Sequence, residues 1–190
     1  KGTIDIEDLQ IGDSVKTSNV TYSRVYSFGH KDHSKHAEYL QIHVGGDVLE
    51  ISGLHILFVD GKATLAKDVR VGDYLGASQR VVKIEIVHRR GLFAPLTESG
   101  KIMVSGVTAS SYVGLLDLNP SLQTYFYDAA LSPLRLVCRL SAFCENESYP
   151  TGISNRIARL VRVGEKVRQH TSPLVQLIAG FSVSRFLHCW

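Results

Sequence analysis

A short phrase that occurs twice is the feature that most restricts the fold of this chain. Residues 8–15 read Asp-Leu-Gln-Ile-Gly-Asp-Ser-Val, and residues 68–75 read Asp-Val-Arg-Val-Gly-Asp-Tyr-Leu. In both copies Gly-Asp marks a turn before a strand, and a β-rich stretch follows over residues 22–28 and 80–87. Two copies are too few for a solenoid. The repeat therefore predicts an internally duplicated all-β domain.

A serine and a histidine lie three positions apart between two apolar runs. Polar and apolar residues alternate over residues 48–53, which predicts a strand that ends in a corner, and another apolar strand begins at Ile56. Ser52 and His55 are therefore placed at a bend where side chains can converge. A histidine in such a position is either a hydrogen-bonded structural group or a catalytic one.

Three motifs from Tyr22 to Tyr112 resemble the autoprocessing domain of hedgehog proteins, a member of the hedgehog/intein (Hint) superfamily. Residues 52–55, Ser-Gly-Leu-His, are similar to the family's Thr-x-x-His. Residues 91–100 resemble its Ala-Pro-Leu-Thr-x-x-Gly segment, and residues 107–112 resemble its Val-x-Ala-Ser-Cys-Tyr. The resemblance implies the pseudo-twofold, all-β Hint fold.

The same resemblance implies a division of the chain. Residues 1–115 would form the autoprocessing domain, without the strand that carries the family's cysteine. Residues 116–190 would form a C-terminal, partly helical appendage that corresponds in position to the family's adduct or sterol-recognition region. From the residues alone, 114–150 read as irregular because Asn119-Pro120 and Ser132-Pro133 are turn signals.

The resemblance also implies a reaction. Hedgehog domains act once, on their own precursor: a cysteine attacks the preceding carbonyl, an N-to-S acyl shift gives a thioester, and a second nucleophile, cholesterol in hedgehog proteins, releases the upstream polypeptide. We expect His55 to protonate the departing amide nitrogen and Ser52 to hold the amide. The cysteine would lie upstream of Lys1, so either the chain begins downstream of it, which we favour, or the gene has lost it.

Two further positions depart from the family pattern. Ser111 occupies the place of the second cysteine, and a hydroxyl there can hydrogen-bond but cannot exchange thiols. His30 occupies the place of an aspartate proposed as the base of the second step, and a neutral imidazole could serve as that base. The acceptor could then be a sterol, another alcohol or water. The alternative function is a catalytically silent Hint-fold binding module.

Charge distinguishes the end of the chain from the rest. Residues 151–190 carry six Lys or Arg and one Glu, whereas residues 1–150 carry fifteen basic and seventeen acidic residues. From Thr151, apolar residues recur at helical spacing with arginines mostly opposite, which predicts a helix that either packs on the domain or lies on a membrane surface. The basic residues have no interleaved aromatic residues, so we expect no nucleic-acid partner.

Residues 28–36 contain the densest group of histidines. His30, His33 and His36 with Asp32 could bind zinc. The alternative, which we favour, is a solvated hairpin loop, because nothing in so polar a stretch fixes three ligands. We expect neither a metal nor a cofactor at the reaction centre.

The cysteines leave the redox compartment open. Cys138, Cys144 and Cys189 have no metal-ligand spacing, and an odd number leaves one without a partner in the chain. Glycosylation sequons at Asn19 and Asn146 would suit secretion. Together with the resemblance, they favour a secretory or extracellular protein, with membrane association possible through residues 151–190.

Overall fold

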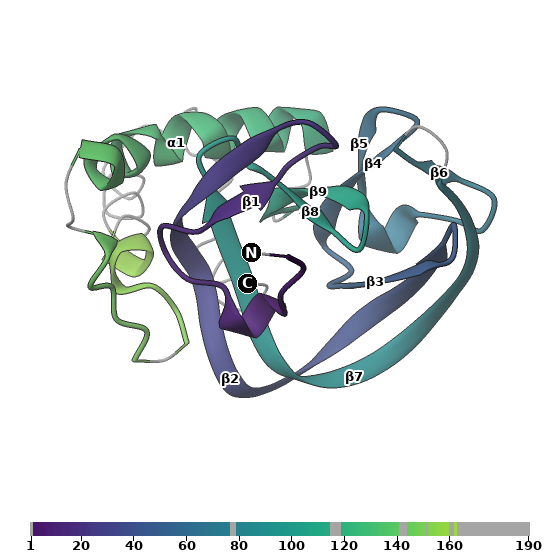
Figure 1. The fold of residues 1–190 in the computed structure, drawn as a ribbon, viewed down its shortest axis with the longest axis horizontal. Helices are drawn as coiled ribbons and strands as arrows, with labels where there is room; N and C mark the ends of the chain where they lie inside the picture. Colours follow the sequence, from purple (N-terminus) through teal and green to yellow (C-terminus); the bar gives the residue numbers. More distant parts are fainter. Residues whose placement is uncertain are drawn as a thin grey trace, which may run out of the picture.

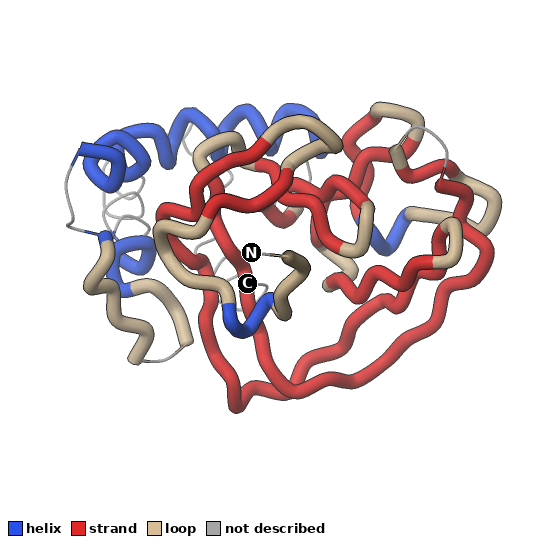
Figure 2. Tube along the Cα trace, in the orientation of Figure 1, coloured by secondary structure: helices blue, strands red, loops and turns tan. Residues whose placement is uncertain are grey.

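The computed structural model describes residues 2–76, 79–114, 119–140, 144–150, 152–159 and 162. Strands make up most of the described chain, and one long helix lies along one side (Figures 1 and 2). The elements are η1 (Ile6–Asp8), β1 (Ser14–Lys16), β2 (Tyr22–Val44), β3 (Asp47–Ile51), β4 (His55–Val59), β5 (Lys62–Leu65), η2 (Ala66–Asp68), β6 (Tyr74–Leu75), β7 (Gln79–Thr97), β8 (Lys101–Val104), β9 (Val107–Val113) and α1 (Pro120–Leu140).

One curled sheet contains all of these strands. Its order is β1-β2-β7-β6-β4-β9-β8, and β3 and β5 pair with β2 and β4. The long antiparallel strands β2 and β7 sweep along the lower edge in Figure 1, and the shorter strands close over them into a nearly closed, barrel-like shell. The all-β class with a helical C-terminal addition is confirmed.

The two copies of the repeated phrase form the same turn. The carboxylates of Asp13 and Asp73 accept the backbone N–H of the residue three positions earlier, at 3.0 and 2.8 Å. Gly12 and Gly72 have φ of +98° and +102°, which glycine adopts without the strain of a Cβ. Each glycine donates its N–H to a carbonyl on the following long strand, at 2.8 and 2.9 Å. The duplication in sequence is therefore a duplication in structure.

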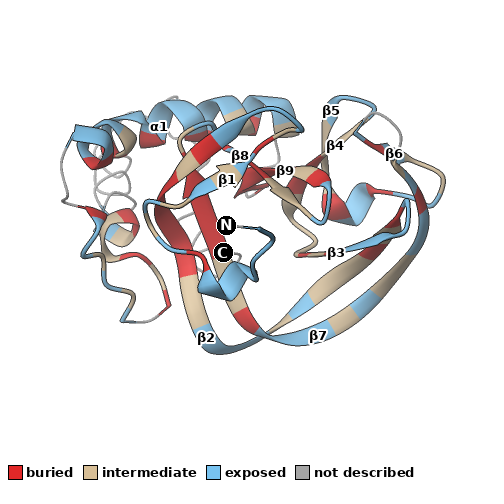
Figure 3. Ribbon diagram, in the orientation of Figure 1, coloured by how far each residue is buried: buried red, intermediate tan, exposed pale blue. Residues whose placement is uncertain are grey.

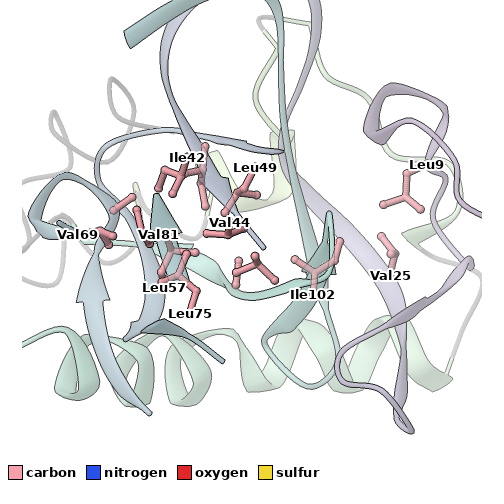
Figure 4. Close-up of a cluster of buried hydrophobic side chains, with 14 of the residues drawn as sticks. Leu9, Val25, Ile42, Val44, Leu49, Leu57, Val69, Leu75, Val81 and Ile102 are labelled. Atoms are coloured by element: carbon pink, nitrogen blue, oxygen red, sulfur yellow. The ribbon is translucent and has the colours of Figure 1, made fainter. Parts of the chain in front are cut away.

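The first core cluster packs apolar residues from both halves. Leu9 and Val69 occupy equivalent places in the two phrases, and both are buried in this cluster (Figure 4). Aliphatic residues of β2, β3, β4 and β7 make up most of the rest of the cluster, in which Leu9 lies beside Val25 at one end and Val69 lies at the other (Figure 4). Burying a side chain of this size contributes about 1.5–3 kcal/mol, so the repeated apolar positions hold the halves together.

The histidine-rich stretch is part of a strand, and the prediction of a hairpin loop there was wrong. Residues 30–36 lie within β2, which pairs with β7 on both sides of them. Register shifts between Phe28 and Lys31 and between Asp32 and His36 mark irregular places in the ladder. The Asp32 carboxylate accepts the N–H of Ser34 at 2.8 Å, which satisfies backbone that leaves the ladder. The polar composition thus marks a bulged strand.

The segment read as irregular contains α1, so that prediction was also wrong. Pro133 lies inside this helix, where its missing N–H leaves the carbonyl of Ala129 without its usual donor. The hydroxyl of Ser132 donates to that carbonyl at 2.8 Å. The serine thereby replaces the hydrogen bond that the proline removes, and the Ser-Pro pair continues the helix.

A second core cluster joins α1 to the sheet. Tyr127, Leu131 and Leu134 of α1 pack against buried residues of β2, β7 and β9, and Tyr112 stacks on Tyr127 with ring centroids 5.4 Å apart. The outward surface of α1 is exposed (Figure 3). A disulfide joins Cys138 to Cys144.

Part of the predicted C-terminal helix is present. Residues 155–159 are helical, and residue 162 is also in helical conformation. Otherwise residues 160–190, with the third cysteine and most of the basic tail, lie outside the described residues, as does the predicted domain boundary at 115/116. Among the described helices, none combines the length and hydropathy needed to cross a bilayer.

Candidate functional site

A cavity of about 490 Å³, partly open to solvent, lies among the strands of the shell. Residues of β3, β4, β7, β8 and β9 line it, and η1 with the residue before it adds Asp5, Ile6 and Glu7. Ser52, His55 and Ser111 all line this cavity. Three of the four residues predicted for the site therefore meet at one place, although 59 positions separate the first from the last.

His55 is held by its neighbours at the first position of β4. Its backbone N–H donates to the carbonyl of Ser52 at 3.0 Å, which closes the predicted bend. Its Nε2 lies 2.8 Å from the carbonyl oxygen of Ser110 on β9. A carbonyl only accepts, so Nε2 carries hydrogen and, in the neutral ring, Nδ1 holds the lone pair.

The surroundings of His55 favour its neutral form. Burial lowers the pKa of His55 below its ordinary value, and the hydrogen bond to the Ser110 carbonyl opposes this shift in part. Near pH 7 the ring is therefore uncharged and oriented. Such a ring can take a proton at Nδ1 and return it, as general acid and base catalysis requires.

Ser111 is buried on β9 and bonded to Thr97 at the end of β7. The two hydroxyl oxygens lie 3.2 Å apart, and the backbone N–H of Thr97 donates to Ser111 Oγ at 3.4 Å. Thr97 Oγ1 in turn donates to the carbonyl of Lys101 at 2.7 Å. Ser111 is thus bonded to a threonine that the prediction did not include.

The remaining wall of the cavity is mainly apolar, with a charged pair among the lining residues. Leu49, Ile51 and Phe93 contribute to the apolar wall. Arg89 makes two hydrogen bonds to the Glu50 carboxylate, at 2.7 and 2.8 Å. This pair lowers the pKa of Glu50 and keeps it charged. Arg89 and Glu50 are therefore committed to each other.

His30, the fourth predicted residue, does not line this cavity. It is 1% exposed on β2 and forms an isolated bridge with Ile153. Burial, with a smaller effect of Lys35, lowers the pKa of His30 to about 4, so the ring is neutral. The segment over it is anchored by Glu147, whose side chain is 1% exposed and which accepts hydrogen bonds from Ser27 at 2.6 Å and from Ser154.

The histidines of residues 30–36 do not gather around a common metal position. His33 lies 3.6 Å from the carboxylate of Glu7, and the Asp32 carboxylate bonds to Ser34. Within the described ranges, no three His, Cys, Asp or Glu side chains gather as metal ligands do.

Sequence reasoning missed two groups of the site. The carbonyl of Ser110, which orients His55, is a backbone atom, so the residue type carries no signal of it. Thr97 lies within the segment of residues 91–100 that was recognised as a motif, and this motif was the available signal.

Comparison with known proteins gives concordant results. The family model described as the Hint module matches residues 1–169. Warthog protein 6 of Caenorhabditis elegans is 30% identical over 169 residues, and Protein hedgehog of Drosophila melanogaster is 30% identical over 158 residues. These alignments cover 78% and 72% of this chain, but only 28% and 32% of the relatives.

Among solved structures, the gp41-1 intein matches with a TM-score of 0.49 and 18% identity, over 56% of this chain and 87% of the intein. An intein-like domain from Clostridium thermocellum matches with a TM-score of 0.48 and 19% identity, over 56% and 87%.

A duplicated, curled all-β shell that encloses a serine and histidine pair defines the class of this protein. The match to the Hint model over most of the chain then gives the family, and the chain belongs to the Hint (hedgehog/intein) family.

Proposed function

We propose that this chain is a self-cleaving domain that cuts an upstream polypeptide from itself through a thioester. The observation that carries the proposal is the arrangement of His55: Nε2 is committed to the Ser110 carbonyl at 2.8 Å, and Nδ1 is left for proton transfer in a cavity that Ser52 also lines. A neutral, fixed imidazole beside a hydroxyl suits the activation of an amide.

The first step is an N-to-S acyl shift. The thiol of a cysteine at the junction, which is the first residue after the upstream polypeptide, gives its proton to Nδ1 of His55, and the thiolate sulfur attacks the carbonyl carbon of the residue before it. As the C–N bond breaks, Nδ1–H gives its proton to the departing nitrogen. The products are a thioester and a free amine, and His55 is neutral again. Ser52 holds the amide through its hydroxyl.

The position of η1 supports this route. Asp5, Ile6 and Glu7 line the cavity that contains His55. A polypeptide joined ahead of these residues reaches the cavity through a short stretch of chain. The scissile amide can therefore be delivered from within the same molecule, which makes the attack intramolecular.

The second step transfers the acyl group to an incoming hydroxyl. Attack by an alcohol gives an ester and attack by water gives an acid, with the thiol released in both cases. The apolar wall formed by Leu49, Ile51 and Phe93 favours a lipid alcohol such as a sterol over water. His30 as the base of this step stays a prediction, because the segment held by Glu147 would have to move before His30 could meet an acceptor.

The proposal includes the cellular compartment in which the domain works. The disulfide favours an oxidising compartment such as the secretory pathway.

Several apolar side chains on α1 are exposed, which suits contact with a lipid surface: Leu122, Tyr125, Phe126, Leu136, Val137 and Leu140. Co-sedimentation with anionic vesicles, lost when Leu136 and Leu140 become serine, measures that contact.

Hydroxylamine tests the proposed reaction directly. A precursor with the native upstream residues is incubated with hydroxylamine, which cleaves thioesters far faster than amides, and the products are separated on a gel. Two fragments, with a hydroxamate at the end of the upstream one, are expected. If the precursor stays intact although it carries an upstream cysteine, the thioester proposal is wrong and a silent binding module takes its place.

A further inference from the structure

The direction of the hydrogen bonds around Ser111 defines what this residue can offer to a substrate. Thr97 Oγ1 donates its only hydroxyl hydrogen to the carbonyl of Lys101, at 2.7 Å. The 3.2 Å contact between the two hydroxyl oxygens therefore has Ser111 as its donor. The hydrogen of Ser111 is directed at Thr97 and away from any partner in the cavity.

The remaining capacity of Ser111 Oγ is as an acceptor. One lone pair receives the weak bond from the backbone N–H of Thr97, at 3.4 Å. A hydroxyl oxygen accepts two hydrogen bonds, so one lone pair remains for the cavity that Ser111 lines. Both side chains are buried, with Thr97 at 0% and Ser111 at 2% exposure, so bulk water does not compete for these bonds.

Ser111 is also coupled to His55 through the backbone. The carbonyl that orients the His55 ring belongs to Ser110, the residue immediately before Ser111. The ring and the hydroxyl are thus held on either side of one peptide unit of β9. A scissile amide in the cavity can then meet a proton donor at Nδ1 and an acceptor at Ser111 Oγ.

We propose that Thr97 is a positioning residue that holds Ser111 as a hydrogen-bond acceptor for the N–H of the scissile amide. The inference rests on the proposed self-cleavage. When Ser111 accepts this N–H, the nitrogen lone pair is turned toward His55, which protonates it as the C–N bond breaks. The bond strengthens as His55 protonates the nitrogen and positive charge builds on it, so it stabilises the transition state for C–N cleavage more than the planar amide.

A double-mutant cycle on the precursor tests the inference. The rate of hydroxylamine-dependent cleavage is measured for Thr97→Val, Ser111→Ala and the double variant. In Thr97→Val the Ser111 hydrogen loses its acceptor and turns into the cavity, so we expect a roughly tenfold lower rate, the value of one hydrogen bond. Ser111→Ala should cost a similar factor. The double variant should be no slower than Ser111→Ala alone, because Thr97 acts through Ser111.

Two further variants separate positioning from folding. Thr97→Ser keeps the hydroxyl and should restore the rate to within about twofold. Thr108→Val is the matched control, because Thr108 is a partly buried β9 threonine that bonds to the carbonyl of Thr17 at 3.2 Å and does not line the cavity. It should cleave at the unaltered rate, and thermal unfolding of each variant reports its folding.

The outcomes are distinct. Thr97→Val at the unaltered rate, or effects of Thr97→Val and Ser111→Ala that multiply in the double variant, would overturn the role of Thr97 and leave the proposed self-cleavage standing. An unaltered precursor with an upstream cysteine that does not cleave would overturn both.

Discussion

Burial and the direction of hydrogen bonds determine the protonation state and orientation of individual side chains in this protein. His55 and His30 are both neutral near pH 7, for the same reason, since burial disfavours their charged forms. They differ in what surrounds them: His55 lines a cavity, whereas His30 lies beneath the segment around Ile153. A neutral imidazole therefore suits the proton transfer proposed for His55 and the packing of His30.

The buried state of His30 predicts a loss of stability in acid. The unfolded histidine titrates near pH 6.5, whereas the pKa of His30 in the fold is lowered to about 4. Below pH 6.5 the unfolded chain binds a proton that the folded chain does not, so His30 removes stability as the pH falls from about 6.5 to 4. The full effect is about 3 kcal/mol. His55 acts in the same direction.

Chemical denaturation at pH 7 and pH 4.5 measures this dependence. His30→Leu should reduce the difference in free energy of unfolding between the two pH values. The control is His88→Leu, because His88 is exposed on β7 and should leave the difference unchanged. An unchanged pH dependence in His30→Leu would show that His30 is not buried as the structure has it.

At the scale of elements, the accuracy of the sequence predictions follows the range of the interactions involved. The repeated Gly-Asp turns depend on local backbone geometry, and they were predicted; Gly12 and Gly72 have φ of +98° and +102°. The helix α1 was missed because Ser132-Pro133 was read as a turn signal. In the structure, the hydroxyl of Ser132 replaces the hydrogen bond that Pro133 removes, so the helix continues. The burial of His30 was missed because it depends on a segment more than a hundred residues away.

The disulfide between α1 and the segment that covers His30 should contribute measurably to stability. Cys138 and Cys144 are six positions apart in the sequence. For a loop of this length, the lower entropy of the unfolded chain stabilises the fold by roughly 2 kcal/mol. We expect a reductant to lower the unfolding midpoint by about 4–8 °C. The Cys138→Ser/Cys144→Ser double variant should unfold at the lower temperature with or without reductant. Sensitivity to reductant that persists in this variant would refute the assignment.

At the scale of the whole molecule, two related halves enclose one cavity. Two sequence motifs contain Ser52, His55 and Ser111, and the resemblance to the family predicted that these residues share one site. All three line the cavity. The sequence could not predict the tautomer of His55 or the direction of the Ser111 hydroxyl, because a backbone carbonyl and Thr97 determine them. The predicted division into 1–115 and 116–190 remains a prediction, although α1 shares a core cluster with the sheet.

The rate of thioester formation with and without His55 tests the central claim most directly. Precursors with the native upstream residues, unaltered, His55→Ala and His88→Ala, are treated with hydroxylamine at pH 7, and the fraction cleaved is followed with time. We expect the unaltered and His88→Ala precursors to cleave at the same rate and His55→Ala to cleave at least a hundredfold more slowly, the low end of the range for general acid and base catalysis. Cleavage of a folded His55→Ala precursor at the unaltered rate would contradict the role assigned to the imidazole in the cavity.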